Sequence, residues 1–321
     1  MKSPFSEPAY KPRNSGWKSW STKKKLLVIG GILLLLIAIA VGLGVGLGLG
    51  LGGGGSEPEE EETQPPPTTP PSGNYTGWQP EVGTTWQIEL RYPLSNMSFD
   101  AKVYDIDLFD NPKSTVEKLQ SMGRKVICYF SAGSYEDWRS DKNKFKPSDM
   151  GKPLSDWEGE KWLNTNSKNV RSIMSDRLDM AKSKGCDGVD PDNVDAYDND
   201  NGLDLTKNDA IDYVNWLANE AHSRNMSVGL KNAGSIIPDV IKGMQWSVNE
   251  QCAQYDECDT YDVFPQAGKP VFHIEYPKGD DTNNNKPVTP QQVKDACDFP
   301  DSKNFSTVIK NMNLDNWIET C

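Results

Sequence analysis

The hydrophobic pattern divides the chain into an apolar run, a polar linker and a long alternating region. Residues 26–51 form an uncharged apolar run, which is long enough to cross the core of a bilayer. Lys23–Lys25 precede the run and acidic residues follow it, so the positive-inside rule puts residues 1–25 in the cytoplasm. We therefore expect a transmembrane signal anchor and a single-pass type II protein of the cell membrane. The alternative is a cleaved signal peptide, but its apolar region is only about 7–15 residues long.

Residues 52–73 are rich in glycine, glutamate and proline. Glycines make a chain flexible, glutamates repel one another, and prolines favour extended polyproline II. This composition predicts a disordered linker that holds an extracellular domain of residues 74–321 away from the membrane. The length of that domain is usual for one (β/α)₈ barrel.

From Thr85 onward, short apolar segments alternate with polar loops and helical stretches. Strands are predicted at residues 86–90, 103–108, 126–131, 188–192, 227–232, 245–250, 271–276 and 307–309. Helices are predicted at residues 112–122, 167–183 and 205–224. Eight strands alternating with helices predict an α/β fold of parallel βαβ units that closes into a TIM-type (β/α)₈ barrel. In such barrels, functional residues lie at the C-terminal ends of the strands.

Six of the predicted strands end in polar side chains. These are Asp105 and Asp107, Tyr129 and Ser131, Asp190, Asp192 and Asn193, Lys231 and Asn232, Asn249 and Glu250, and Glu275 and Tyr276. One such residue is most often a solvated strand end. Polar side chains at the ends of six strands, all converging on one mouth of a barrel, predict a site.

The fourth strand places two carboxylates, Asp190 and Asp192, on one face. Two neighbouring carboxylates repel, so one can hold a proton while the other stays ionised. Asp190 and Asp195 are alternatively structural hydrogen-bond partners. A calcium site is a further alternative, because residues 190–200 are rich in aspartate, but the spacing is not that of an EF-hand, and no metal is predicted.

Glu250 shares a strand face with Trp246 and Val248, and we expect it opposite Asp192 at the barrel mouth. One carboxylate from each of two strands can flank a glycosidic bond, whose hydrolysis needs a nucleophile or base and a general acid. The chain has only two histidines and lacks GxSxG, Walker and dinucleotide-binding glycine patterns. The pattern therefore favours a glycoside hydrolase that needs no cofactor.

The formal net charge of −12 is unevenly distributed. Residues 1–25 are basic, the linker has five glutamates, and the domain is left near −13. An acidic surface argues against nucleic acid and is compatible with a cationic ligand. The alternative is that acidity only keeps a secreted protein soluble.

All six cysteines lie in the predicted domain. An even count without CxxC favours disulfides over a metal site. We prefer the pairs Cys252–Cys258 and Cys297–Cys321, which leaves Cys128 with Cys186, although the sequence allows other pairings. Glycosylation sequons that agree with export begin at Asn74, Asn96, Asn225 and Asn304.

Several of these segments resemble the fungal and bacterial endo-α-1,4-polygalactosaminidases, glycoside hydrolase family 114. The resemblance covers residues 78–321 and is most specific in the segments WQIEL (86–90), VYDIDLF (103–109), VICYFSAGSYEDW (126–138), GVDPDN (188–193), GLKN (229–232) and VNEQC (248–252). The N-terminal anchor is similar to that of a membrane-bound fungal member. The resemblance implies endo-hydrolysis of α-1,4-linked galactosamine in a cationic polysaccharide such as galactosaminogalactan.

The resemblance also implies roles for individual residues. Asp192 matches the nucleophile and Glu250 the acid/base of a retaining enzyme, in which the two carboxyl groups lie about 5–5.5 Å apart. Lys231 is expected to pair with Asp192 or Asp190 and to keep that carboxylate ionised; the alternative is that this pair is purely structural. Other residues expected to contact substrate are Asp107, Asp190, Asp195 and Glu275 through amines and hydroxyls, Tyr129, Tyr255 and Tyr276 through stacking, and Asn193 and Asn232.

Two alternatives stay open. One is a non-catalytic carbohydrate-binding protein of the cell surface, and the other is a barrel glycosidase that acts on another α-linked sugar.

Overall fold

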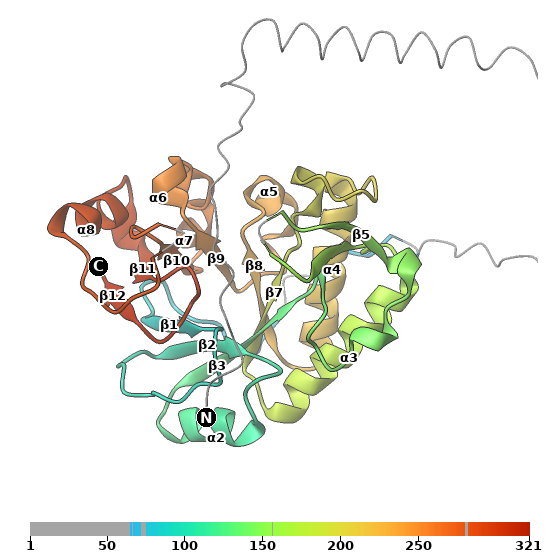
Figure 1. Ribbon diagram of the computed structural model, residues 1–321, viewed down its shortest axis with the longest axis horizontal. Helices are drawn as coiled ribbons and strands as arrows, with labels where there is room; N and C mark the ends of the chain where they lie inside the picture. The colour runs from blue at the N-terminus through green and yellow to red at the C-terminus, as the bar shows by residue number, and fades with distance from the viewer. Residues whose placement is uncertain (1–64, 66, 72–74, 156, 280–281) are drawn as a thin grey trace, which may run out of the picture. The chain divides into compact units, whose positions relative to one another are not determined.

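The computed structural model describes residues 65, 67–71, 75–155, 157–279 and 282–321. They form an α/β barrel-like domain around a nine-stranded sheet (Figure 1). The predicted cytoplasmic tail, the anchor, most of the linker and Asn74 lie outside the described residues. Among the residues that are described, no helix is long and apolar enough to span a membrane.

Eight strands of this sheet are parallel and follow one another in sequence order. They are β1 (Trp86–Glu89), β2 (Val103–Asp107), β3 (Lys125–Ser131), β7 (Gly188–Asp192), β8 (Ser227–Lys231), β9 (Trp246–Glu250), β10 (Val271–Glu275) and β11 (Phe305–Lys310). β12 (Ile318–Thr320) adds an antiparallel edge beside β11. All eight predicted strands are confirmed, with ends that differ by at most two residues.

The three predicted helices are confirmed as α2 (Lys113–Ser121), α3 (Lys168–Lys184) and α4 (Lys207–Ser223), and α8 (Pro290–Cys297) follows β10. The other connections depart from a regular (β/α)₈ repeat. β8 and β9 are followed only by the short helices α5 (Ile237–Val240), α6 (Cys252–Tyr255) and α7 (Val263–Gln266). Between β1 and β2, the described chain contains no helix. The 3₁₀ turns are η2 (Lys142–Lys144), η3 (Pro147–Asp149), η4 (Ala196–Asp198), η5 (Gly234–Ile236), η6 (Cys258–Thr260) and η7 (Ser302–Asn304).

A small second sheet is inserted between β3 and α3, and it was not predicted. It has the order β4–β6–β5 and consists of β4 (Ser134–Glu136), β5 (Met150–Pro153) and β6 (Glu160–Leu163). Strands this short contain too few alternating positions to be recognised from hydrophobic periodicity.

The interior of the barrel is filled by alternate strand residues. Its apolar members are Trp86, Ile88, Val103, Ile127, Trp246, Val248, Phe272, Ile274 and Val308. Gly188 and Gly229 make room for the Trp246 ring, because a Cβ added at either position would lie 2.5 or 2.0 Å from an indole atom. The opposite strand faces pack against the helices in a separate, larger core.

The seam between β1 and β11 is held by side chains, since the ladder of paired strands ends at β1 on one side and continues from β11 to β12 on the other. The Trp86 indole donates to the Ser306 carbonyl at 2.7 Å, and the buried Lys310 ammonium donates to Gln87 Oε1 at 2.9 Å. The sheet is therefore nearly closed.

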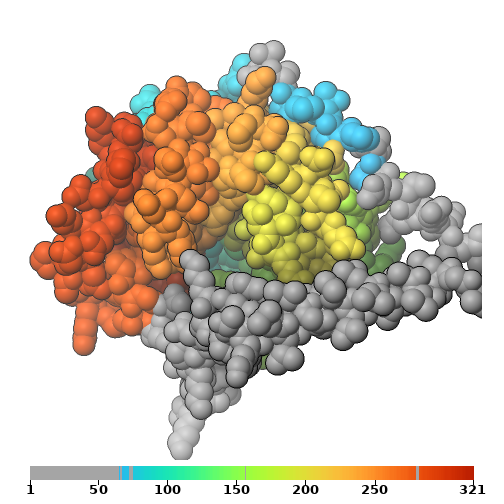
Figure 2. All heavy atoms as spheres, turned by 90° about the horizontal axis from the view of Figure 1, so that it is seen from above, coloured from blue at the N-terminus to red at the C-terminus, as the bar shows by residue number. Residues whose placement is uncertain are grey.

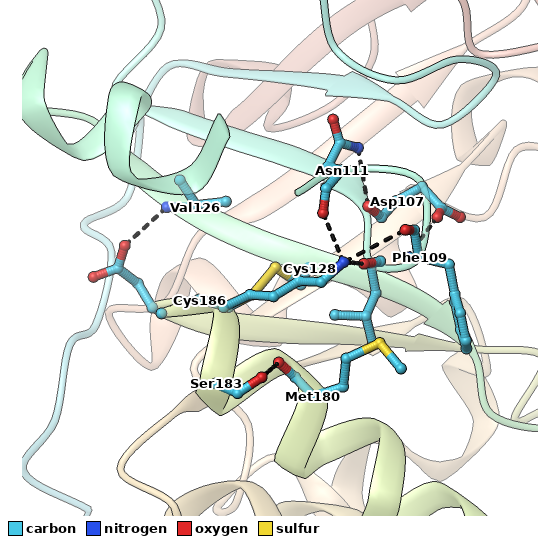
Figure 3. The surroundings of a disulfide bond; sticks show 12 residues. Asp107, Phe109, Asn111, Val126, Cys128, Met180, Ser183 and Cys186 are labelled. Carbon is cyan, nitrogen blue, oxygen red and sulfur yellow. Dashed lines mark hydrogen bonds between the residues drawn. A yellow bond between two sulfur atoms is a disulfide. The ribbon is translucent and has the colours of Figure 1, made fainter. Parts of the chain in front are cut away.

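All three predicted disulfides are confirmed: Cys128–Cys186, Cys252–Cys258 and Cys297–Cys321. The first joins β3 to the segment after α3, beside the loop that follows β2 (Figure 3). Lys184 ties the same loop down, because its ammonium donates to the carbonyls of Leu108 and Asn111 at 2.6 and 2.7 Å. Three disulfides are typical of a domain that folds in an oxidising compartment.

We expect the Cys128–Cys186 bond to stabilise the domain more than the Cys252–Cys258 bond. Their sequence separations are 58 and 6 residues, and the chain-entropy model then gives about 4 and about 2 kcal/mol. Urea unfolding of the Cys128→Ala/Cys186→Ala and Cys252→Ala/Cys258→Ala variants measures both losses. An equal or larger loss for the second variant contradicts the expectation.

Candidate active site

Three adjacent strands end at one cluster of charges. Asp192, Lys231 and Glu250 are the last residues of β7, β8 and β9, and strand alternation turns all three side chains inward. The Lys231 ammonium lies 3.4 Å from Asp192 Oδ2 and 3.3 Å from Glu250 Oε2. The two carboxylates therefore do not face each other from opposite sides of the mouth, but flank one intervening strand.

Each of the three strands ends in the same way. The residue directly after each charged group, namely Asn193, Asn232 or Gln251, has a positive φ of 60°, 47° or 65°. Non-glycine residues adopt this conformation infrequently, and Asn does so more readily than most. The turn takes the main chain away from the strand and leaves the charged side chain at the mouth.

Asp192 is fixed by several donors. Tyr129 donates its hydroxyl to Oδ2 at 2.9 Å, and the backbone N–H of Asn193 donates to Oδ1 at 2.8 Å. The Asn193 amide donates in turn to Ser131 Oγ at 2.9 Å. Gly133 allows this turn to form, because a Cβ there would lie 1.7 Å from the Asn193 carbonyl oxygen.

Glu250 is held equally firmly. Tyr276 donates its hydroxyl to Oε1 at 2.5 Å, and the Asn232 amide donates to Oε2 at 3.1 Å. The Glu250 backbone N–H returns a bond to Asn232 Oδ1 at 2.9 Å. Burial alone would raise the pKa of Glu250, but the Lys231 ammonium and the Tyr276 hydroxyl outweigh it, and the pKa is lowered.

Lys231 itself is 2% exposed. Burial would lower the pKa of its ammonium, but the carboxylates of Asp192, Glu250 and Asp190 outweigh burial and raise that pKa. The residue is therefore a fixed cation, and its ammonium also lies 5.6 Å from the centre of the Tyr129 ring.

A cleft of about 520 Å³ opens beside Glu250. Its wall comes from the segments after β7, β8 and β9, and it includes Asp195, Asp198, Asn232, Tyr255, Glu257 and Tyr261. Figure 2 views this side from above, with the segment after β9 in orange and the segment after β7 in yellow. Burial and the charge of Asp192 raise the pKa of Asp195 to about 6. This value is still below neutral pH, where most of the Asp195 carboxyl group is ionised.

Only some of the residues that were predicted to contact substrate lie at the cleft. Asp195, Asn232 and Tyr255 line it, and Tyr255 is 63% exposed. Tyr129 and Tyr276 instead donate hydrogen bonds to the two carboxylates. These two rings therefore orient the charged groups, whereas stacking on sugars was expected.

Three acidic residues predicted to bind substrate are buried away from the cleft. Asp107 accepts two bonds from the Arg139 guanidinium, at 3.1 and 2.6 Å, and caps the loop after β2. Glu275 is on the outer face of β10, where it accepts bonds from the Ala253 N–H and from His273. Asp190 lies inside the barrel and is 0% exposed.

The residues expected to contact substrate did not include Asp198 and Glu257 of the cleft wall, and the buried Asp105 was named only as one of the polar strand ends. Asp198 lies in the 3₁₀ turn η4 and Glu257 directly precedes η6, and neither residue belongs to a segment with hydrophobic periodicity. Asp105 alternates with Val103 and Asp107 on one strand face, so the same rule that selected Asp190 applies to it.

One group in the described part of the chain has the spacing of metal ligands, namely Cys252, Cys258 and His273. The two cysteines are joined in a disulfide and offer no thiolate. What the charged cluster supplies is two fixed carboxylates on either side of one cation. That set suits proton transfer and nucleophilic attack at a single centre.

Comparison with known proteins identifies the domain. Residues 67–321 match the model of glycoside-hydrolase family GH114. The crystal structure of Aspergillus fumigatus Ega3 in complex with galactosamine is 73% identical, with a TM-score of 0.76, and the match covers 77% of this chain and 100% of that one. The glycoside hydrolase domain of PelA from Pseudomonas aeruginosa shares the fold, with 12% identity and a TM-score of 0.56 over 74% of this chain and 98% of that one. An uncharacterized protein of Deinococcus radiodurans is 27% identical over 196 residues, which is 53% of this chain and only 63% of that protein's length.

We expect Tyr276→Phe to raise the pKa of Glu250. The hydroxyl of Tyr276 stabilises the ionised carboxylate, so its removal favours the protonated form. Carbon-13 NMR of the Glu250 side-chain carboxyl as a function of pH measures the change. Tyr255→Phe is the matched control, because this tyrosine is exposed in the cleft wall and the Glu250 carboxylate is bonded instead by Tyr276 and Asn232. An unchanged midpoint in Tyr276→Phe contradicts the prediction.

Proposed function

The chain belongs to glycoside-hydrolase family GH114, and from this premise we propose that it is an endo-α-1,4-polygalactosaminidase acting on a galactosaminogalactan-type exopolysaccharide. The observation that carries this proposal is the pairing of Asp192 and Glu250 around Lys231 at the ends of three adjacent strands. Glycoside hydrolysis requires such a pair of carboxyl groups at one bond.

Asp192 is the nucleophile and Glu250 the acid/base in this proposal. Both are partly exposed at the strand ends, whereas Asp190 is fully buried and unable to reach a sugar. Asp192 receives bonds from Tyr129 and Asn193 that hold a carboxylate in one orientation. Attack on a sugar carbon needs an ionised, oriented oxygen of this kind.

The shared Lys231 ammonium limits the separation of the two carboxyl groups to a range that includes the retaining distance and excludes most of the inverting range. One ammonium lies 3.4 Å from an Asp192 oxygen and 3.3 Å from a Glu250 oxygen, so these two oxygens are at most the sum of those distances, 6.7 Å, apart. Retaining glycosidases hold the groups about 5–5.5 Å apart, and inverting enzymes about 6.5–9.5 Å apart.

The charge of the cleft supports a cationic sugar as substrate. Four carboxylates line it, from Asp195, Asp198, Glu250 and Glu257. The ammonium of galactosamine is attracted to such a wall, and galactosamine is the sugar bound in the Ega3 crystal structure. Asp195, Asn232 and Tyr255 then contact the polymer, while Asn193 and Lys231 act through Asp192.

We further propose that the enzyme is displayed outside the cell on residues 26–51 as a type II anchor, with residues 52–73 as spacer and a (β/α)₈-type domain at 74–321. The three disulfides and the sequons of the exposed Asn96 and Asn225 and the partly exposed Asn304 support an extracellular domain.

The catalytic assignment is tested with Asp192→Asn and Glu250→Gln. Each variant is expected to lose activity on α-1,4-galactosamine oligomers by about 10²–10⁴-fold or more, because each removes one reacting carboxyl group. Asp200→Asn is the control, since Asp200 is an exposed partner of Lys152 on the surface. Reducing-end release is measured in parallel on galactosamine, N-acetylgalactosamine and galactose oligomers. Binding without turnover by the wild type contradicts the enzymatic proposal, and a preference for galactose contradicts the proposed sugar.

The anchor is tested by where the activity is found. For cells that express the full chain, the activity is expected to stay with the cells and to sediment with their membranes after lysis, because an apolar run of this length inserts stably. Replacing residues 1–51 with a cleavable secretion signal is expected to release the activity into the medium. Activity of the full chain in the medium contradicts the anchor.

A further inference from the structure

Two aspartates lie beneath the charged cluster and have no role in the reaction described so far. Asp105 of β2 and Asp190 of β7 both point into the barrel, and each is 0% exposed. Asp190 precedes Asp192 by two strand positions, which puts it about 6–7 Å deeper in the barrel. The pair therefore forms the floor under Lys231.

The hydrogen bonding of this pair is incomplete unless it holds a proton. None of the four carboxyl oxygens receives an N–H or O–H from another residue of the described chain. The two carboxyl groups are close enough to hydrogen-bond each other. Two ionised carboxylates without donors repel each other strongly in a dry interior. A single proton removes the conflict, because one group then donates and the other accepts.

The surroundings indicate how that proton is shared. Burial, followed by the negative charge of Asp190, raises the pKa of Asp105 well above its ordinary value. Burial also raises the pKa of Asp190, but Lys231 opposes this effect and leaves the value at about 7. Within the pair, Asp105 therefore holds the proton more readily and Asp190 ionises more readily.

The charge of the pair bears on Glu250. Lys231, Tyr276 and Asn232 all favour the ionised form of Glu250, whereas a general acid must hold its proton until it protonates the leaving group. A negative charge on Asp190 opposes them, since Asp190 and Glu250 interact electrostatically. The charged and titratable groups facing this region are Asp105, Tyr129, Asp190, Asp192, Lys231, Glu250 and Tyr276.

We propose that Asp105 and Asp190 share a single proton and are positioning residues, whose one negative charge offsets the Lys231 ammonium and keeps Glu250 able to hold its proton. The inference rests on the proposed role of Glu250 as acid/base. Asp105 and Asp190 need not contact Glu250 directly, because the negative charge that they share acts on Glu250 and Lys231 electrostatically.

Asparagine variants of the full chain test the shared proton. Asp105→Asn and Asp190→Asn each replace one carboxyl with an amide that donates to the remaining carboxylate, so each single variant keeps one negative charge. We expect each to stay within about threefold of wild-type activity with an unchanged pH profile. The double variant has no charge, and loss of a negative charge favours ionised Glu250. Its basic limb of kcat/KM against pH is therefore expected to move to lower pH by about one pH unit.

Asp187→Asn is the matched control, because Asp187 pairs with Lys125 just before β7, away from the charged cluster. It is expected to leave the pH profile unchanged. A double variant with the wild-type pH profile overturns the proposal, as does a shift in both single variants, which indicates two ionised groups. A purely structural role lowers the activity of the variants but leaves the limb in place.

Infrared spectroscopy tests the proton independently of activity and of the double variant's ability to fold. The difference spectrum between wild type and Asp105→Asn at about pH 8, above the pKa of Asp190, is expected to contain one protonated-carboxyl C=O band that shifts in D₂O. Absence of that band overturns the proposal. If Asp192→Asn and Glu250→Gln stay active, the proposed function fails, but the infrared result still decides whether the pair shares a proton.

Discussion

The site depends on one buried ammonium placed between two carboxylates. Removing an ammonium from water is costly unless it is paired, and Lys231 is almost fully buried. In the parallel register of β8 and β9, Lys231 is paired with Val248, and Glu250 lies two residues further along β9. The pairing of Lys231 with both carboxylates therefore depends on the registers of β7, β8 and β9, which are part of the electrostatics of the site. A one-residue slip of any of these strands would turn its charged end to the outer face.

Close approach of the backbone makes this arrangement possible. Gly188 and Gly229 accept the Trp246 ring in the layer below the cluster, and Gly133 accepts the carbonyl of Asn193 beside it. Above the cluster, the left-handed residues Asn193 and Asn232 end the strands immediately after their charged residues. Such conformations persist where the surrounding structure holds them, and they are often found at functional sites. Here they let the loops of the cleft begin directly at the reacting groups.

The sequence predicted the parts of this structure that follow from local periodicity. In β9, Trp246, Val248 and Glu250 share a face, and the two apolar members identify that face as the interior. In β10, Phe272 and Ile274 share the interior face with Tyr276, whereas Glu275 shares the other face with Val271 and His273. Strand-end position alone selected both Glu275 and Tyr276, although alternation separates them. The role of Asp107 depends on Arg139, a partner 32 residues away, and no local pattern predicts that ion pair. The small inserted sheet was missed for the same reason, because its strands are defined by pairing and not by period.

The symmetric position of Lys231 follows the movement of charge that the proposed reaction requires. Before bond cleavage, Asp192 carries the negative charge and Glu250 holds a proton. Afterwards, Asp192 is esterified to the sugar and neutral, and Glu250 has become the carboxylate. The pair therefore carries one negative charge at both stages, and that charge moves from one residue to the other. An ammonium 3.4 Å from one carboxylate and 3.3 Å from the other stabilises both states without moving. A fixed charge of this kind needs no reorganisation during the reaction, which is the condition for effective electrostatic catalysis.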